Sequence, residues 1–207
     1  LSEKYNVLKT EGNFNNEIGL PLTVLRIRNE HDVAVLEMGI NHFGEMHRLS
    51  RIAKPDVCVI TNIGQCHLEF LIDRDGILRA KSEIFDFMNP DGVVCLNGDG
   101  VLQAKTEVFS HLKENAQVYL NGDDDKLITV ENVHGKQPVF FGRGDSCDIR
   151  AVNVENLGLE GSKADVIERG TAKGEETYAI RLYVPGEHMV SNALAAVAVG
   201  RALGLSK

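Results

Sequence analysis

Short apolar runs separated by polar loops fill the first half of the chain and predict a parallel sheet. Val33–Met38 and Val57–Asn62 each begin with a continuous apolar run, which is typical of strands buried on both faces. Glu45–Ala53 and Asp73–Met88 carry apolar residues at helical spacing. Further strands are expected at Asn6–Thr10, Val93–Leu96, Gln117–Leu120 and Val139–Phe141, and further helices near Pro21 and over Val101–Leu112. This alternation predicts an α/β fold with a mostly parallel sheet flanked by helices.

The pattern changes in the C-terminal third. Ile149–Val184 alternates strand-like runs with glycine turns and predicts a smaller antiparallel section packed beside the parallel sheet. Glu187–Leu203 is rich in alanine and is followed by Gly204, which predicts a helix with a glycine stop. We therefore expect one domain over 1–207, with a mainly parallel part at 1–148, an antiparallel part at 149–185 and a terminal helix at 186–204.

Composition narrows the class of protein. The 207 residues are 43% hydrophobic and carry a net charge of −8, without a basic stripe, which argues against general nucleic-acid binding. The sequence has neither an apolar stretch long enough for a membrane span nor the apolar core of a signal peptide. Its four cysteines form no CxxC pair, which fits reduced thiols. These features predict a soluble cytosolic protein.

Two strand ends deliver side chains suited to a metal. Glu37 follows the apolar run 33–36, and His67 follows the strand that begins at Val57. Because ligands of open α/β sheets bind beyond the carboxyl ends of the strands, these two side chains could converge on Mg²⁺. A solvated strand end for Glu37 and a hydrogen-bonded loop residue for His67 are the plainer interpretations. Zinc and a nucleophilic Cys66 are disfavoured, since the cysteines and histidines lack paired spacing and adjacent residues rarely face each other.

Lys81 lies in the helical segment ILRAKSEIF, where an ordinary solvated lysine is the simple interpretation. The alternative is a carbamate, formed when the neutral amine reacts with CO₂. Deprotonating a lysine at pH 7 costs about 4 to 5 kcal/mol, and burial or metal coordination of the product lowers that cost. A carbamate would turn this cation into an anion that binds magnesium.

Two polar segments could contact a nucleotide. The loop EGNFNNEIGLP places Asn15 and Asn16 before a helix, a composition suited to an anion and also to ordinary turns. In PGEHMVSNALAA, His188 and Asn192 are four residues apart at a helix start and face the same side, although plain capping would also explain them.

Taken together, five motifs in one order resemble the central domain of the Mur ligases, ATP-dependent enzymes that form amide bonds in peptidoglycan precursors. They are TEGNFNNEIGLPLT, VLEMGINHFGEM, AKPDVCVITNIGQCHLEFL, ILRAKSEIF and PGEHMVSNALAAVAVGRALGL, and they span nearly the whole chain. The first two look most like the members that add D-alanyl-D-alanine to UDP-N-acetylmuramoyl-tripeptide.

The resemblance implies a P-loop-type sheet with ATP and Mg²⁺ as cofactors. It implies that Glu37 and His67 coordinate magnesium, that Lys81 is carbamylated, and that Asn192, with His188, borders the adenine. Asn15, Asn16 or both would lie near the phosphates. The implied substrates are UDP-N-acetylmuramoyl-tripeptide and D-alanyl-D-alanine, joined through an acyl phosphate.

The chain departs from the family pattern in two respects. The phosphate loop GxxGKT occurs nowhere in it and is expected shortly before Leu1, so we expect the 207 residues alone to fold without turning over ATP, with Lys81 an ammonium paired with Glu37. LIDRDG stands where relatives carry a glycine–serine pair. Two alternatives stay open: another amide ligase of the superfamily, such as a folylpolyglutamate synthase or a different Mur ligase, and a non-catalytic nucleotide-binding or interaction module.

Overall fold

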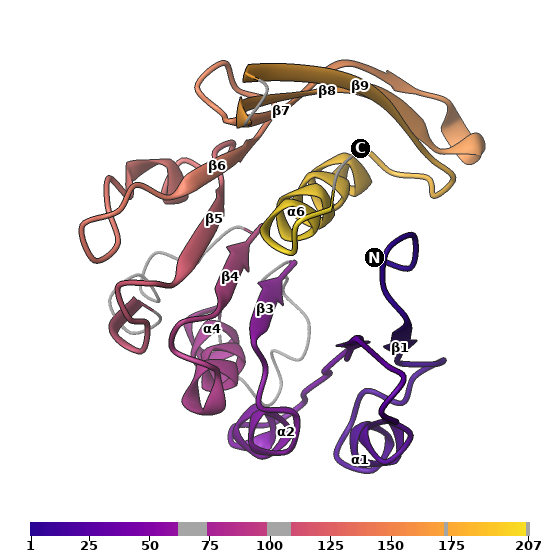
Figure 1. Ribbon diagram of the computed structural model, residues 1–207, viewed down its shortest axis with the longest axis vertical. Helices are drawn as coiled ribbons and strands as arrows, with labels where there is room; N and C mark the ends of the chain where they lie inside the picture. Colours follow the sequence, from indigo (N-terminus) through magenta and orange to yellow (C-terminus); the bar gives the residue numbers. More distant parts are fainter. Residues whose placement is uncertain (62–73, 99–108, 172–173, 206–207) are drawn as a thin grey trace.

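The computed structural model describes residues 1–61, 74–98, 109–171 and 174–205. Its longer sheet, among the described residues, has the strand order β3-β4-β5-β6-β7-β8-β9, and a separate two-stranded sheet pairs β1 with β2 (Figure 1). The strands are β1 Val7–Lys9, β2 Val33–Val35, β3 Val57–Ile60, β4 Val93–Leu96, β5 Gln117–Asn121, β6 Val139–Gly142, β7 Ile149–Asn156, β8 Ser162–Thr171 and β9 Gly174–Leu182.

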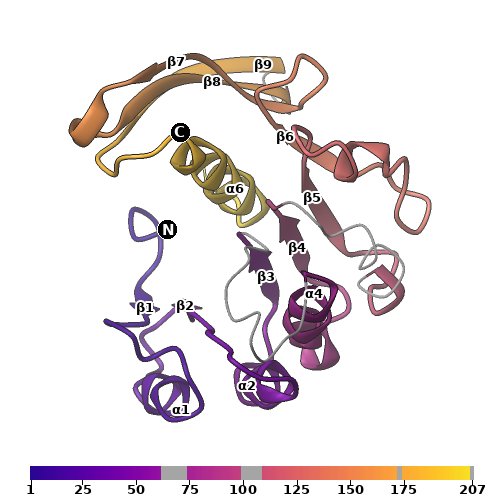
Figure 2. The same ribbon diagram turned by 180° about the vertical axis from the view of Figure 1, so that it is seen from behind.

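The helices lie on both sides of the longer sheet. The α-helices are α1 Gly19–Val24, α2 Glu45–Ala53, α4 Arg74–Ser82 and α6 His188–Ala202, and the 3₁₀ turns are η1 Glu83–Phe87, η2 Leu127–Thr129 and η3 Gly158–Glu160. Figures 1 and 2 show α6 inside the curve of the sheet, with α2 and α4 on its outer side. None of these helices combines the length and apolar character that a membrane crossing requires.

The predicted fold class is confirmed, with one difference in how its two parts join. β3 to β7 pair in parallel, and β7, β8 and β9 pair antiparallel. The antiparallel section therefore continues the parallel sheet through the β6–β7 pair, where the sequence indicated a section packed beside it. Because β7 pairs with the edge of β6, the backbone N–H and C=O groups along that edge are hydrogen-bonded. A separate layer packed on the sheet would leave them unpaired.

Element boundaries differ from the predictions where side chains take over backbone hydrogen bonds. β2 ends at Val35, two residues before Glu37, because the Glu37 N–H donates to Thr10 Oγ1 at 2.9 Å. The helix expected to run to Met88 tightens into η1 after Ser82, where the Ile84 carbonyl accepts the Ser50 hydroxyl at 2.6 Å. Most of the helix expected at Val101–Leu112 lies outside the described residues.

Two apolar cores hold the sheet. One lies between β3 to β5 and the outer helices, and includes Leu49 and Leu96. The other lies under α6 and includes Phe141 and Leu194, both fully buried. Because α6 is packed by the strands around it, its position follows that of the sheet.

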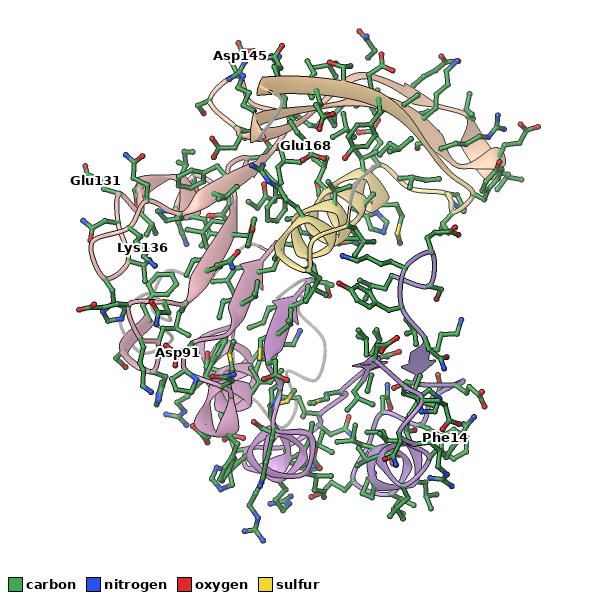
Figure 3. The ribbon with its side chains drawn as sticks, viewed as in Figure 1. Phe14, Asp91, Glu131, Lys136, Asp145 and Glu168 are labelled. Atoms are coloured by element: carbon green, nitrogen blue, oxygen red, sulfur yellow. The ribbon has the colours of Figure 1, made fainter. Side chains whose placement is uncertain are left out.

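Polar contacts fasten the C-terminal end of the α6 segment. The side chain of Glu168, a residue of β8, points toward α6, and its Oε2 lies 3.9 Å from Arg201 Nη1 (Figure 3). The predicted glycine stop is confirmed, since Gly204 has φ +71° and its N–H donates to the Arg201 carbonyl at 2.9 Å. Lys4 Nζ donates to the Gly204 carbonyl at 2.7 Å, so the first residues of the chain lie against the end of this helix.

Leu194→Ala should lower the free energy of unfolding by about 2–5 kcal/mol, because it leaves a cavity in the core under α6. Urea unfolding followed by circular dichroism measures this. The matched control is Leu159→Ala, whose side chain is 92% exposed and should change stability by less than about 0.5 kcal/mol. Equal effects of the two changes would contradict the packing of α6 described above.

Candidate functional site

Glu37 stands at the carboxyl end of β2 and is exposed. Its backbone is fixed by the hydrogen bond to Thr10, which follows β1. Its Oε1 accepts a hydrogen bond from Asn15 Nδ2 at 2.9 Å. The segment after β2 and the loop before α1 thus bring one carboxylate and one amide together, and the carboxylate keeps acceptor capacity for a cation.

The asparagine loop is held against the end of β2 by close backbone contacts. The Gly39 N–H donates to the Asn15 carbonyl at 2.8 Å, and a Cβ at Gly39 would lie 3.1 Å from Asn15 Nδ2. At the other end of the loop, a Cβ at Gly19 would lie 2.4 Å from the Phe14 Cα. Glycine at both positions lets the loop fold tightly enough to bring Asn15 to Glu37.

Asn16 has a different contact from its neighbour. Its Oδ1 accepts the N–H groups of Ile18 at 3.1 Å and Gly19 at 2.9 Å. The side chain therefore satisfies donors at the start of α1. It positions the loop, while Asn15 reaches the carboxylate.

A groove with a volume of about 760 Å³ lies between β2 and β3. Glu37 and Lys81 both line it, together with Thr10 and Thr61. Figures 1 and 2 show the β1–β2 pair set apart from β3 on this side of the molecule. The structure thus brings two of the three predicted metal residues to one groove.

Lys81 is partly buried near the end of α4. The adjoining turn is fixed by Glu83, whose carboxylate accepts the Gly44 N–H at 2.9 Å and the His47 N–H at 3.2 Å at the start of α2. These contacts hold the end of α4 against α2. The proposed pairing of Lys81 with Glu37 stays a prediction.

The third predicted metal residue, His67, lies outside the described residues. Within the described part of the chain, no group of three or more histidine, cysteine, aspartate or glutamate side chains could hold a metal ion. A magnesium site here would therefore draw on Glu37, on oxygens of neutral side chains and on residues beyond the described set.

His188 and Asn192 lie at the start of α6 and do not line the groove. His188 is exposed, whereas Asn192 is partly buried. Asn192 Oδ1 accepts a hydrogen bond from Asn97 Nδ2 at 2.7 Å. Of the two predicted adenine residues, Asn192 thus belongs to a second polar cluster, at the carboxyl ends of β4 and β5.

That cluster contains two residues the sequence analysis did not select. Asn97 follows β4 directly and is 6% exposed, and Asn121 ends β5 at 9% exposed. Asn121 Nδ2 donates to Asn97 Oδ1 at 3.2 Å. A recurring asparagine directly after an apolar strand could have revealed both, because strand ends of a parallel sheet meet at one edge.

The fold and these two clusters define a class: an α/β domain with polar side chains gathered at the carboxyl ends of parallel strands. The family model for the Mur ligase middle domain matches residues 1–102 and 98–200. The chain therefore belongs to the Mur ligase family.

Two relatives show how the chain compares with complete proteins. It is 37% identical over 207 residues to the UDP-N-acetylmuramoyl-tripeptide–D-alanyl-D-alanine ligase of Bacillus subtilis, covering 100% of this chain and 37% of the relative. It is 31% identical over 210 residues to the ligase of the same name from Escherichia coli, covering 99% and 39%. The chain thus spans well under half the length of these relatives.

Solved structures agree with this assignment. A crystal structure of MurF from Acinetobacter baumannii has a TM-score of 0.75 at 35% identity, covering 100% of this chain and 39% of that one. MurF from Thermotoga maritima in complex with ADP has a TM-score of 0.68 at 25% identity, covering 100% and 41%. FolC of Escherichia coli, at 15% identity and a TM-score of 0.53 with 98% and 48% covered, shares the fold.

Asn16→Ala should destabilise the protein by about 1 kcal/mol, because it removes the acceptor for two N–H groups at the start of α1. Asn16→Asp keeps an acceptor and should stay within about 0.5 kcal/mol of the parent. Urea unfolding compares the two variants. A loss of the same size in both would show that the Asn16 side chain does not act as a cap.

Proposed function

We propose that the chain is the ATP-binding central domain of a ligase that adds D-alanyl-D-alanine to UDP-N-acetylmuramoyl-tripeptide. The relatives from Bacillus subtilis and Escherichia coli carry that name. The observation that carries the proposal is the groove, because Glu37 and Lys81 line it together and Asn15 is held against Glu37.

The proposed reaction has two steps. The terminal carboxylate of the tripeptide attacks the γ-phosphorus of ATP, which forms an acyl phosphate and releases ADP. The amine of D-alanyl-D-alanine then attacks the acyl carbon, an amide bond forms, and inorganic phosphate leaves as the amine loses a proton. Both steps bring negatively charged or electron-rich groups together, so the domain must orient them and offset their charge.

Mg²⁺ fits the residues at the proposed site. Glu37 is an exposed carboxylate with free acceptor capacity, and Thr10 and Thr61 line the same groove with hydroxyl oxygens. Hard oxygen donors of this kind suit magnesium. Glu37, His67 and a carbamylated Lys81 would hold the metal, whose positive charge would offset the repulsion between phosphate and carboxylate.

Lys81 would serve this site only after chemical change. Its neutral amine would attack the carbon of CO₂, forming an N–C bond and losing a proton, which leaves an anionic carbamate. Lys81 is partly buried, and the groove that it lines also includes the apolar side chains of Ile60 and Ile84.

The nucleotide would lie along the carboxyl ends of the strands. Asn15 and Asn16, in the loop before α1, would border the phosphates, and His188 and Asn192 at the start of α6 would border the adenine. The ADP complex of the Thermotoga maritima relative supports nucleotide binding by this fold. A folylpolyglutamate synthase activity receives less support, because the 15% identity with FolC shows the fold alone.

A cytoplasmic location accords with the cysteines. Among the described residues, Cys58, Cys95 and Cys147 are free and buried. Burial raises the pKa of Cys58 and of Cys95 to about 12, so these thiols stay protonated and unreactive at neutral pH. Free thiols of this kind are typical of a reducing compartment.

Lys81→Ala in the full-length enzyme should lower the rate of ligation by roughly 100-fold or more, because it removes a ligand of the proposed metal site. Phosphate release that depends on both tripeptide and dipeptide measures the rate. Lys136→Ala is the matched control, since Lys136 is exposed in an outer loop and does not line the groove (Figure 3). Near-normal activity of the Lys81 variant would exclude the proposed role.

Carbamylation itself can be seen by NMR. The full-length enzyme equilibrated with ¹³C-labelled bicarbonate and Mg²⁺ should show a carbamate carbon resonance that is missing in Lys81→Ala and present in Lys136→Ala. A spectrum without that resonance, recorded on an active enzyme, would exclude the carbamate and leave Lys81 as a cation.

A further inference from the structure

A chain of three asparagine side chains crosses the carboxyl edge of the sheet from β5 to α6. Asn121 Nδ2 donates to Asn97 Oδ1 at 3.2 Å and to the Asn97 carbonyl at 3.1 Å. Asn97 Nδ2 donates in turn to Asn192 Oδ1 at 2.7 Å. The three residues come from three separate elements, and the first two are buried.

Backbone hydrogen-bonding groups fix the orientation of these side-chain amides. Asn121 Oδ1 accepts the Asp123 N–H at 2.9 Å, and a backbone N–H can only donate. The Asn121 amide must therefore turn its NH₂ group toward Asn97, where a backbone carbonyl, which can only accept, receives it. With its oxygen facing Asn121, Asn97 has only its NH₂ group to offer to Asn192.

The orientation of the Asn97 amide fixes that of Asn192, the partly buried member of the three asparagines. Asn192 must present Oδ1 to Asn97, so its Nδ2 points the other way, toward Met189 Sδ at 3.7 Å. A thioether sulfur is a weak acceptor, and a ring nitrogen of a nucleobase would replace it readily. Reversing the Asn192 amide would set two NH₂ groups against each other and break a hydrogen bond beside a buried side chain.

We propose that Asn97, anchored by Asn121, is a positioning residue that locks the polarity of the Asn192 amide and thereby selects adenine over guanine. This inference rests on the proposed function, in which Asn192 borders the base. Adenine carries an NH₂ donor at position 6 beside a ring-nitrogen acceptor, the pattern that an asparagine amide reads with its oxygen and its NH₂ group. Guanine carries an acceptor at position 6, so the locked amide opposes it.

The locked amide retains what this contact needs. Oδ1 has two lone pairs, of which Asn97 uses one, and Nδ2 has two hydrogens. Asn192 can therefore accept from the adenine NH₂ group and donate to the ring nitrogen while it stays bonded to Asn97. An amide free to rotate would be able to turn its NH₂ group toward the acceptor at position 6 of guanine, which the locked amide cannot do.

Two variants of Asn97 in the full-length enzyme test this. Asn97→Leu leaves the backbone carbonyl as an acceptor for Asn121 but releases Asn192 to turn over. Asn97→Asp replaces the donor with an acceptor, so Asn192 reverses and donates its NH₂ group to the new carboxylate. The ratio of kcat/KM for ATP to that for GTP should fall about tenfold or more in both variants, because the bidentate contact with the base is what discriminates between nucleotides. The KM for D-alanyl-D-alanine should stay unchanged.

Asn156→Asp is the control for adding a carboxylate. Asn156 is exposed, and its Oδ1 accepts the Gly158 N–H at 2.8 Å, a contact that aspartate keeps. Its ATP-to-GTP ratio should equal that of the parent. A merely structural role for Asn97 would lower the rates with both nucleotides alike and leave the ratio unchanged, which would overturn the proposal.

Two further outcomes are decisive. A parent enzyme that uses GTP as well as ATP overturns the proposal without any variant, whereas a parent without ATP-dependent ligation overturns the proposed function. Where both Asn97 variants fail to fold, side-chain amide NMR of the parent labelled with ¹⁵N-asparagine replaces them. The Asn192 resonances should shift with ATP at concentrations where GTP leaves them in place, and equal shifts would overturn the proposal.

Discussion

The register of the parallel strands β3, β4 and β5 is the constraint on which the rest of the structure depends. Ile60 pairs with Leu96, and Leu96 pairs with Leu120, so the three strands end together. The next residue along each strand is polar: Thr61, Asn97 and Asn121. A slip of one residue would turn every side chain of a strand to the opposite face and scatter these three groups. The apolar core thus sets the geometry of the polar edge.

The same register explains why Asn192 of α6 meets the second polar cluster. Its underside is buried by the core that contains Phe141 and Leu194, so the helix has little freedom to slide. Asn192, in the second turn, then meets Asn97 at a fixed distance. The position of Asn192 on the helix is therefore fixed as firmly as that of Asn97 at the end of a strand. Nearly a hundred residues separate the two asparagines along the sequence.

The sequence predicted the fold more completely than the contacts within it. The continuous apolar runs of β3 and β4 and the glycine stop at Gly204 carry local information, and each was confirmed. The direction of the Asn121–Asn97–Asn192 chain depends on strand order and register, which no local pattern encodes. The same reason explains why Glu83, predicted only as part of a helix, was not identified as the acceptor for the start of α2.

The candidate site was also only partly predictable from the sequence. Glu37 could be selected because a carboxylate after an apolar run is costly unless a cation or a donor meets it. Its actual donor, Asn15, was selected for a different role, since the close approach of the loop depends on Gly19 and Gly39. Composition indicated a polar loop, and only the tertiary structure shows which of the two asparagines, Asn15 or Asn16, reaches the carboxylate.

The charges at the proposed metal site would couple carbamylation of Lys81 to the binding of Mg²⁺. The protein carries a net charge of −8, and Glu37 adds a carboxylate to the groove that Lys81 also lines. A carbamate on Lys81 would place two anions at one groove, where the two negative charges would repel each other unless a cation lay between them. Mg²⁺ would remove that repulsion, and the carbamate would supply the second anionic ligand. Carbamylation and metal binding would then stabilise each other by the same free energy, because coupling between two binding events is reciprocal. In the proposed enzyme, Lys81 would therefore be a conditional ligand, whose chemical state would follow the occupancy of the metal site.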